Sequence, residues 1–155
     1  MDPFESGENI LDIGPFMMKG RFTDYAALHL LTTATLARLS ELYSEARFDA
    51  RRFRPNVLVE TPTYQNGFVE NDWIGRIVAI GDEVRLQVAD PTPRCSIPTL
   101  AHGELPRDPR VLRTIAEHNM LPFSALDGQI MPCAGVYAFV VQGGTVRTGD
   151  KVRIE

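Results

Sequence analysis

The chain has 155 residues, the size of one ordinary domain and enough to bury a hydrophobic core. Hydrophobic residues make up 44% and charged residues 23%, which is typical of a folded globular protein and excludes a disordered or fibrous one. The net charge of -4 argues against general nucleic-acid binding, because neutralising phosphates needs an excess of Lys and Arg. The acidic start does not resemble a secretory signal, and no apolar run is long enough to cross a membrane. Two cysteines cannot form a disulfide scaffold, so a reducing cytoplasm is the simplest location, with no nucleic acid or membrane as partner.

The first part of the chain predicts a lead-in followed by a helix. Residues 1–18 mix Gly, Pro and acidic residues and are expected to be irregular, with a short strand near residues 16–18, whereas residues 19–155 form the domain. A helix is predicted to begin at Thr32 or Thr33, because either hydroxyl can cap free backbone N–H groups, and to continue to residue 45. Four apolar residues then share one helical face, namely Leu36, Leu39, Leu42 and Tyr43.

After this helix, short apolar runs with a period near two predict β-strands. Residues 56–60 predict a buried strand. Residues 77–80 and 84–88 predict a hairpin, because the Gly-Asp-Glu sequence between them suits a tight turn. Further strands are predicted over residues 135–141 and 152–154.

A repeated motif and a second helix complete the predicted fold. The sequence Gly-Asp-Glu-Val-Arg-Leu at residues 81–86 recurs as Gly-Asp-Lys-Val-Arg-Ile at residues 149–154, which predicts two equivalent turns that each start a strand of one sheet. A helix is predicted from Pro109 to about Met120, with Asp108 as its N-cap. Its inward face would carry Val111, Leu112 and Ile115. We expect a mainly β (β-rich α+β) fold, a partly closed antiparallel β-barrel with two helices, in preference to a sandwich, because short strands with Gly-Asp turns suit a curved sheet.

Cys95 lies in a segment with three prolines, residues 90–99. Because proline forbids a helix and lacks a backbone N–H, the segment is expected to leave the sheet as a stiff loop that presents Arg94 and Cys95. A thiolate is a nucleophile and a ligand for soft or borderline metals, and a neighbouring cation favours it. The alternative is that Cys95 is a small buried hydrophobic residue, as most single cysteines are. Cys133 lies between a turn and an apolar strand and is expected to be core.

Residues 46–56 contain four arginines interleaved with two phenylalanines. The pattern fits single-stranded nucleic acid, which binds by stacking and charge, and equally a phosphorylated small ligand held by guanidinium groups. A third interpretation, a solvated loop with its phenylalanines in the core, is favoured for Arg47 and Arg51. Arg54 is different, because Pro55 and a buried strand follow it directly and define its position.

The three histidines do not predict a metal cluster. His29, His102 and His118 are far apart in the sequence, and each is expected to be structural or exposed. No HxxxH or CxxC pattern, Gly-rich phosphate loop, Ser-His-Asp order or carboxylate pair stands out.

Several motifs together resemble one family. In chain order they are His-Leu-Leu-Thr-Thr-Ala-Thr-Leu at 29–36, Arg-Phe-Arg-Pro-Asn at 52–56, Asp-Trp-Ile-Gly at 72–75 followed by Ile-Gly at 80–81, Pro-Arg-Cys at 93–95, and Gly-Thr-Val-Arg-Thr-Gly-Asp at 144–150. Their joint order resembles MOSC domains, the C-terminal domains of molybdenum-cofactor sulfurases and of relatives that include the mitochondrial amidoxime-reducing component. The resemblance covers residues 19–155.

The resemblance implies a β-barrel-like domain that binds a pterin-based molybdenum cofactor or carries sulfur for its maturation. Cys95 would be the molybdenum ligand and catalytic residue, or the persulfide carrier. Arg54 and Asn56, with Arg94, would hold the pterin and its phosphate. The family is also associated with pyridoxal phosphate binding.

The same resemblance implies a reaction and partners. Thr32 and Thr33 match a Thr-Thr segment whose helix start is a plausible anion site. The expected reaction is the molybdenum-dependent, two-electron reduction of N-oxygenated substrates. An electron-transfer protein would supply the two electrons. The alternatives are a sulfur carrier loaded by a cysteine desulfurase, and a non-catalytic binding module. The sequence departs from the family pattern at two points. It does not contain the Lys-Ser cofactor contact that larger relatives carry in an N-terminal barrel. It also has residues 98–102 where the amidoxime-reducing relatives have Thr-Val-Asp after the cysteine.

Overall fold

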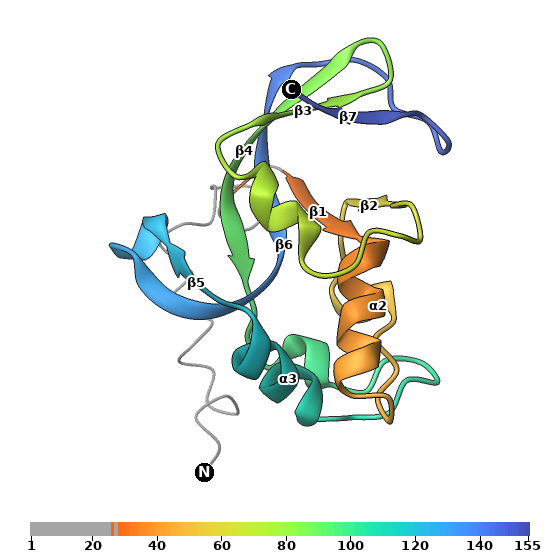
Figure 1. Cartoon of the computed structure of the whole chain (residues 1–155), viewed down its shortest axis with the longest axis vertical. Coiled ribbons are helices and arrows are strands. Elements are labelled where there is room, and N and C mark those ends of the chain that lie inside the picture. Colours follow the sequence, from red (N-terminus) through yellow and green to blue (C-terminus); the bar gives the residue numbers. More distant parts are fainter. Residues whose placement is uncertain (1–25, 27) are drawn as a thin grey trace.

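The chain forms one mixed β-sheet that curls nearly into a barrel, with two α-helices packed below it (Figure 1). This computed structural model describes residue 26 and residues 28–155. The strands are β1 (Leu28–Thr32), β2 (Val57–Val59), β3 (Ile77–Ile80), β4 (Val84–Pro93), β5 (Met120–Phe123), β6 (Gln129–Gln142) and β7 (Val152–Ile154). The helices are α2 (Thr33–Leu42) and α3 (Arg110–His118), with 3-10 turns η2 (Ala50–Arg52), η3 (Val69–Trp73), η4 (Ile97–Thr99) and η5 (Ser124–Leu126). The predicted β-rich, partly closed barrel with two helices is confirmed, while the strand predicted at residues 16–18 lies outside the described residues.

The order of strands in the sheet is β2-β1-β6-β4-β3-β7, and β5 pairs with β6 beside this path. The strands β2 and β7 are therefore the two edges of the curled sheet. The two Gly-Asp turns are equivalent as predicted, because each starts a strand that pairs with β3: β4 after Gly81 and β7 after Gly149. Both glycines have positive φ, at 60° and 94°, a backbone conformation that glycine adopts without strain.

One strand pair differs from the antiparallel prediction. Leu30 pairs with Val57 and Thr32 with Val59 in parallel, whereas the other strand pairs of the described chain are antiparallel. Parallel neighbours need a long crossover, and α2 with the arginine-rich segment supplies it. The crossover places Arg-Phe-Arg-Pro-Asn directly before β2, next to β1.

The proline segment was predicted to leave the sheet, and this prediction is wrong for its first half. The strand β4 continues through Pro91 to Pro93 and stays paired with β6, where Pro93 lies opposite Cys133. Irregularities between Val88 and Asp90, and again between Pro91 and Pro93, interrupt the regular register. Such bulges accommodate residues that cannot donate a ladder hydrogen bond. The loop itself begins only at Arg94.

Two hydrophobic clusters lie on opposite faces of β1, as the alternation of side chains along a strand requires. Leu30 packs inside the barrel with Leu86 and Val136, whereas Leu31 packs in the layer of α2 and α3. The helix α2 begins at the predicted position, with Thr32 as N-cap, and ends at Leu42. The helix α3 begins one residue later than predicted, and its predicted inward residues Val111, Leu112 and Ile115 are all buried.

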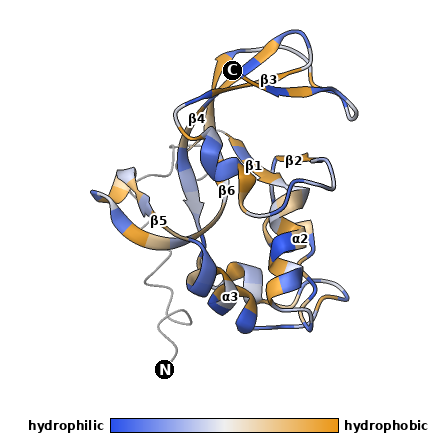
Figure 2. Ribbon diagram, viewed as in Figure 1, coloured by the Kyte–Doolittle hydropathy of each residue, from blue (hydrophilic) through white to orange (hydrophobic). Residues whose placement is uncertain are grey.

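The end of β4 is hydrophilic in sequence although it is part of the sheet, as Figure 2 shows. Asp90 and Thr92 are both buried there. The Asp90 carboxylate accepts hydrogen bonds from the backbone N–H and the hydroxyl of Ser124, at 3.0 and 2.6 Å. These contacts satisfy a buried charged group and fix η5 against the strand that leads to the cysteine loop.

Candidate functional site

Cys95 lies in a short loop between the end of β4 and η4, and it is half-buried. The backbone on either side is well fixed. Before it, the Arg94 N–H donates to Pro132 O at 2.8 Å; after it, the Thr99 hydroxyl and N–H both donate to Ser96 O, at 2.6 and 2.9 Å. Cys95 is thus a partly exposed residue on a backbone held at both ends, and this agrees with the second half of the predicted stiff loop.

Arg94 ties this loop to two other segments. Its Nε and Nη2 donate to Ala134 O on β6, at 2.8 and 2.6 Å, and its Nη1 donates to Phe53 O at 3.1 Å. The guanidinium carbon also lies 5.2 Å from the centre of the Phe53 ring, within the range of a cation–π contact. In this arrangement Arg94 joins the Arg-Cys and Arg-Phe-Arg-Pro-Asn motifs, which are far apart in the sequence.

His29 on β1, which was expected to be structural or exposed, joins the same two motifs. Its Nε2 contacts Nη2 of Arg94. Its backbone N–H donates to Oδ1 of Asn56 at 2.7 Å, and its carbonyl accepts from the Asn56 N–H at 2.9 Å. Burial and then the neighbouring Arg94 charge lower the pKa of His29 well below its ordinary value, so the ring is neutral and can accept from the guanidinium.

The space for this histidine depends on Gly135. A Cβ atom at that position would collide with Nε2 of His29 and lie 2.7 Å from Leu30 O, and the glycine has a φ of 85°. Only glycine meets both demands. A signal in the sequence could have pointed to this contact, because Gly135 interrupts an otherwise apolar strand.

The two remaining members of the predicted pterin-binding set are on the surface. Arg54 is exposed and has a positive φ of 51°, and its N–H donates to Ala50 O at 3.1 Å. Asn56 is exposed although its Oδ1 and N–H are bonded to β1. Strain at a non-glycine residue with positive φ persists only where surrounding structure enforces it, and it often marks functional positions.

Arg52 has a structural role that the sequence did not indicate. The residue is buried, and its guanidinium donates to four backbone carbonyls, those of Arg47, Pro98, Leu100 and Pro106. These contacts fasten the segment after Cys95 to the arginine-rich loop. By contrast, Arg51 is exposed and pairs with the carboxylates of Asp49 and Glu104, as expected for a solvated arginine.

The two threonines at the start of α2 bond to other parts of the chain. Thr32 is fully buried, and its hydroxyl donates to Oε2 of Glu70 at 2.7 Å while accepting from the Thr35 N–H. The Thr35 hydroxyl also bonds to the Glu70 carboxylate. The Thr33 hydroxyl lies 3.0 Å from that of Thr61. Burial raises the pKa of Glu70, although the two threonine hydroxyls act in the opposite direction.

The second cysteine is in the core, as predicted. Cys133 is fully buried, and its thiol donates to Met131 O at 3.2 Å. Burial raises its pKa to about 12, which keeps it protonated and unreactive at neutral pH. His102 and His118 are both exposed. In the described part of the chain, no three His, Cys, Asp or Glu side chains are grouped so that they could hold a metal ion.

The chain folds as a nearly closed mixed barrel with two helices, and a comparison with known families identifies its class. The family model for the MOSC domain matches residues 18–153. The chain therefore belongs to the MOSC domain family, as the order of its motifs predicted.

One solved structure extends this result. The fold is similar to the crystal structure of YiiM from Geobacillus stearothermophilus, with a TM-score of 0.54 and 21% identity over 84% of this chain. The matched part makes up 54% of the YiiM chain, so the present chain spans about half the length of that relative. No curated protein matches the sequence. Within the described residues, no helix is long and apolar enough to cross a membrane.

Proposed function

We propose that this MOSC domain binds a molybdenum cofactor through the thiolate of Cys95. The observation that carries the proposal is the contrast between the two cysteines. Cys95 is partly exposed on a backbone fixed by Arg94, whereas Cys133 is buried and its pKa is raised to about 12. A soft metal needs a sulfur ligand that it can reach, and of the two cysteines Cys95 is the one that is not buried.

Arg54 and Asn56 have the chemistry to bind the rest of such a cofactor. The exposed Arg54 would bind the phosphate, since a guanidinium can donate two parallel hydrogen bonds to it. Asn56 lies two residues away, and its backbone and Oδ1 are fixed by His29, so that its amide can hold the pterin. Arg94 would act mainly by position, because its Nε, Nη1 and Nη2 already donate to Ala134 O and Phe53 O. The sequence suggested that Thr32 and Thr33 bind the cofactor as well, but the Thr32 hydroxyl is buried and bonded to Glu70, so in this proposal Thr32 only caps α2. Thr33 bonds to Thr61 in the same region.

When bound, the cofactor would supply a two-electron reduction in which an N-oxygenated substrate takes up two electrons and two protons and releases its oxygen as water. The electrons would come from an electron-transfer protein. The residues of this chain would hold the cofactor, fix its orientation, and limit access of water through the half-buried position of Cys95.

The experiment is a comparison of three proteins made in a host that synthesises the cofactor. Molybdenum and pterin per chain are measured for the wild type, for Cys95→Ser and for Cys133→Ser. We expect molybdenum in the wild type and in Cys133→Ser, because serine can keep the hydrogen bond to Met131 O. Cys95→Ser should lose most of it. Equal molybdenum in all three proteins would refute the role of Cys95.

A second function rests on the same partly exposed cysteine, namely sulfur transfer. A persulfide on Cys95 needs an accessible thiol and no further ligand. It predicts cyanide-labile sulfur on the wild type after incubation with a cysteine desulfurase and cysteine, and none on Cys95→Ser. Absence of labile sulfur on the wild type would eliminate this alternative.

A further inference from the structure

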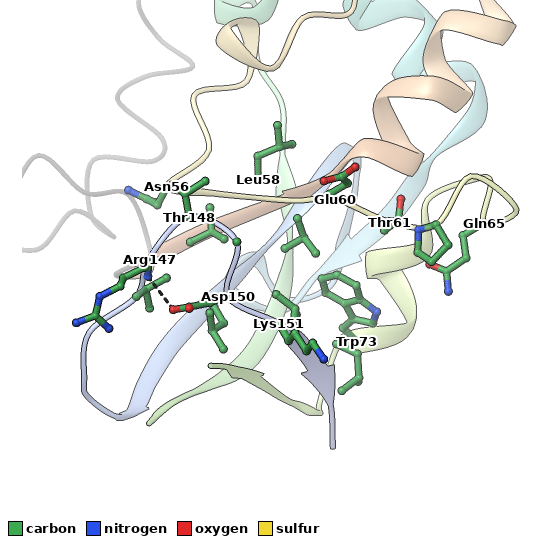
Figure 3. A pocket seen from close by; sticks show the side chains of 18 residues that line it. Asn56, Leu58, Glu60, Thr61, Gln65, Trp73, Arg147, Thr148, Asp150 and Lys151 are labelled. Atoms are coloured by element: carbon green, nitrogen blue, oxygen red, sulfur yellow. Dashed lines mark hydrogen bonds between the residues drawn. The ribbon is translucent and has the colours of Figure 1, made fainter. Parts of the chain in front are cut away.

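The ring of His29 lies where the two motifs of the candidate site meet. His29 is on β1, which lies between β2 and β6 in the sheet, and 7% of the residue is exposed. Its backbone holds Asn56, a residue that lines a groove beside β2 (Figure 3), through two hydrogen bonds. Its ring contacts Arg94 and the backbone of Arg54 instead. A change of the side chain therefore affects Arg94 and Arg54 and leaves the bonds to Asn56 in place.

The contact with Arg94 determines which ring nitrogen can carry the proton. Nε2 of His29 faces Nη2 of Arg94, and a guanidinium nitrogen only donates, so Nε2 has to accept and the proton of the neutral ring is on Nδ1. A proton on Nε2 would place two donors against each other. Such a proton would also compete for Ala134 O, which already accepts from Nε and Nη2 of Arg94.

The Arg54 carbonyl is available as the acceptor for a proton on Nδ1. Burial, and then the Arg94 charge, lower the pKa of His29, whereas hydrogen bonding to the backbone of Arg54 and of Ala134 raises it. A backbone group that raises the pKa of a histidine is a carbonyl, because an acceptor favours the protonated ring. Since Ala134 O is occupied by Arg94, the Arg54 carbonyl is left for the Nδ1–H.

Both partners of the ring lie in segments whose position matters for the site. The Arg94 N–H donates to Pro132 O at the start of the loop that carries Cys95. Arg54 has a positive φ of 51°, which persists in a residue other than glycine only where other contacts enforce it. A ring that accepts from Arg94 and donates to Arg54 fixes the two segments relative to each other.

The strand β6 leaves room for the ring nitrogen. A Cβ atom at residue 135 would collide with Nε2 of His29, and Gly135 avoids this collision. The ring also has an edge contact with Tyr137, with 6.2 Å between the ring centroids. Phenylalanine would keep that packing, whereas the contact with Arg94 needs a nitrogen. Packing alone therefore does not account for a histidine at this position.

We propose that His29 is a positioning residue of the cofactor site: protonated on Nδ1, it donates to the Arg54 carbonyl and accepts from Arg94 with Nε2. The ring thereby holds the loop of Cys95 and the backbone of Arg54 in one arrangement before a cofactor binds. This role rests on the proposed function, in which Cys95 and Arg54 bind the same cofactor. Groups that are fixed in advance lose less conformational freedom on binding, and affinity increases accordingly.

The first test is made on the whole protein without cofactor. Nitrogen-15 NMR of the histidine rings distinguishes a protonated from an unprotonated nitrogen, and a coupling between Nε2 of His29 and Nη2 of Arg94 identifies the hydrogen bond between them. At neutral pH we expect a protonated Nδ1, an unprotonated Nε2 and this coupling. A proton on Nε2, or one distributed over both nitrogens, would overturn the assignment.

The second test compares two substitutions of the ring. His29→Phe keeps the shape and the edge contact with Tyr137 but removes both nitrogens, whereas the amide oxygen of His29→Gln can still accept from Arg94. The dissociation constant for molybdenum cofactor is measured for each folded variant, together with its unfolding in urea. We expect His29→Phe to weaken binding about tenfold or more, and His29→Gln only about threefold. Equal binding by the two variants would mean that the ring only fills space and would overturn the proposal.

A failure of His29 and a failure of Cys95 give different results. If the wild type binds no cofactor, ligation by Cys95 is refuted, while NMR of the cofactor-free protein still decides the hydrogen bonds of the ring. If His29→Phe binds the cofactor as tightly as the wild type and Cys95→Ser does not, the proposed function stands and the role of His29 is refuted.

Discussion

Replacing Arg52 by methionine should destabilise the domain severely, although the side chain lies in an arginine-rich, hydrophilic segment. The guanidinium is buried and donates to the carbonyls of Arg47, Pro98, Leu100 and Pro106, at 2.8, 3.2, 3.3 and 2.8 Å. A hydrogen bond from a charged donor contributes about 1.5–3 kcal/mol, but such contributions are not additive. Loss of the whole set, with carbonyls left unpaired, should cost about 3–5 kcal/mol of the free energy of unfolding.

The assay is urea unfolding followed by fluorescence and circular dichroism, with the thermal midpoint as a second measure. For a domain of this size, about 3–5 kcal/mol corresponds to a decrease of about 6–20 °C in Tm. The matched control is Arg51→Met, since this adjacent arginine is exposed and its pairs with Asp49 and Glu104 are screened by water and salt. Equal destabilisation by the two substitutions would refute the assignment of Arg52 as the residue that fastens the loop after Cys95.

Three further predictions follow from the described contacts. Because burial raises the pKa of Glu70, the wild type should lose stability relative to Glu70→Gln as the pH rises from 4.5 through the raised pKa; a pH-independent difference in unfolding free energy would contradict this. Gly135→Ala should lower the free energy of unfolding by about 2–4 kcal/mol, because the added methyl group collides with His29 on a backbone of positive φ. An unchanged free energy of unfolding in urea would contradict this, since it would mean that β6 shifts to make room for the methyl group at no cost. Iodoacetamide should modify Cys95 in the native protein and Cys133 only after unfolding, as mass spectrometry of digests would show, and equal rates would be inconsistent with the burial of Cys133.

Local patterns in the sequence were sufficient to predict much of the fold. The Thr32 cap, the hairpin of β3 and β4, and the second Gly-Asp turn before β7 follow from short segments whose backbone needs are met by neighbouring residues. The parallel pairing of β1 with β2 could not be predicted in this way, because it depends on where a long crossover returns. The extension of β4 through Pro91 was missed because irregular pairing with β6 tolerates the absent N–H groups.

In the candidate site, too, the features that depend on neighbouring residues were predicted and those that depend on distant contacts were not. Arg94 and Cys95 were selected as candidates because they are adjacent and follow prolines, and Cys133 was correctly assigned to the core. His29 and Arg52 were not recognised as contacts that hold the site together, because their partners are backbone atoms and a side chain distant in the sequence. A buried, hydrogen-bonded arginine has the same local sequence as a solvated one, and only the tertiary contacts of Arg52 and Arg51 distinguish them.

The measurement that tests the central claim most directly is reconstitution of the purified protein with molybdenum cofactor released from another molybdenum protein. After removal of free cofactor, molybdenum per chain is determined by mass spectrometry for the wild type and for Cys95→Ser. The proposed ligation predicts retention of molybdenum close to one atom per wild-type chain and its loss from Cys95→Ser. Equal retention by the two proteins, or none by the wild type, would contradict the assignment of Cys95 as the molybdenum ligand.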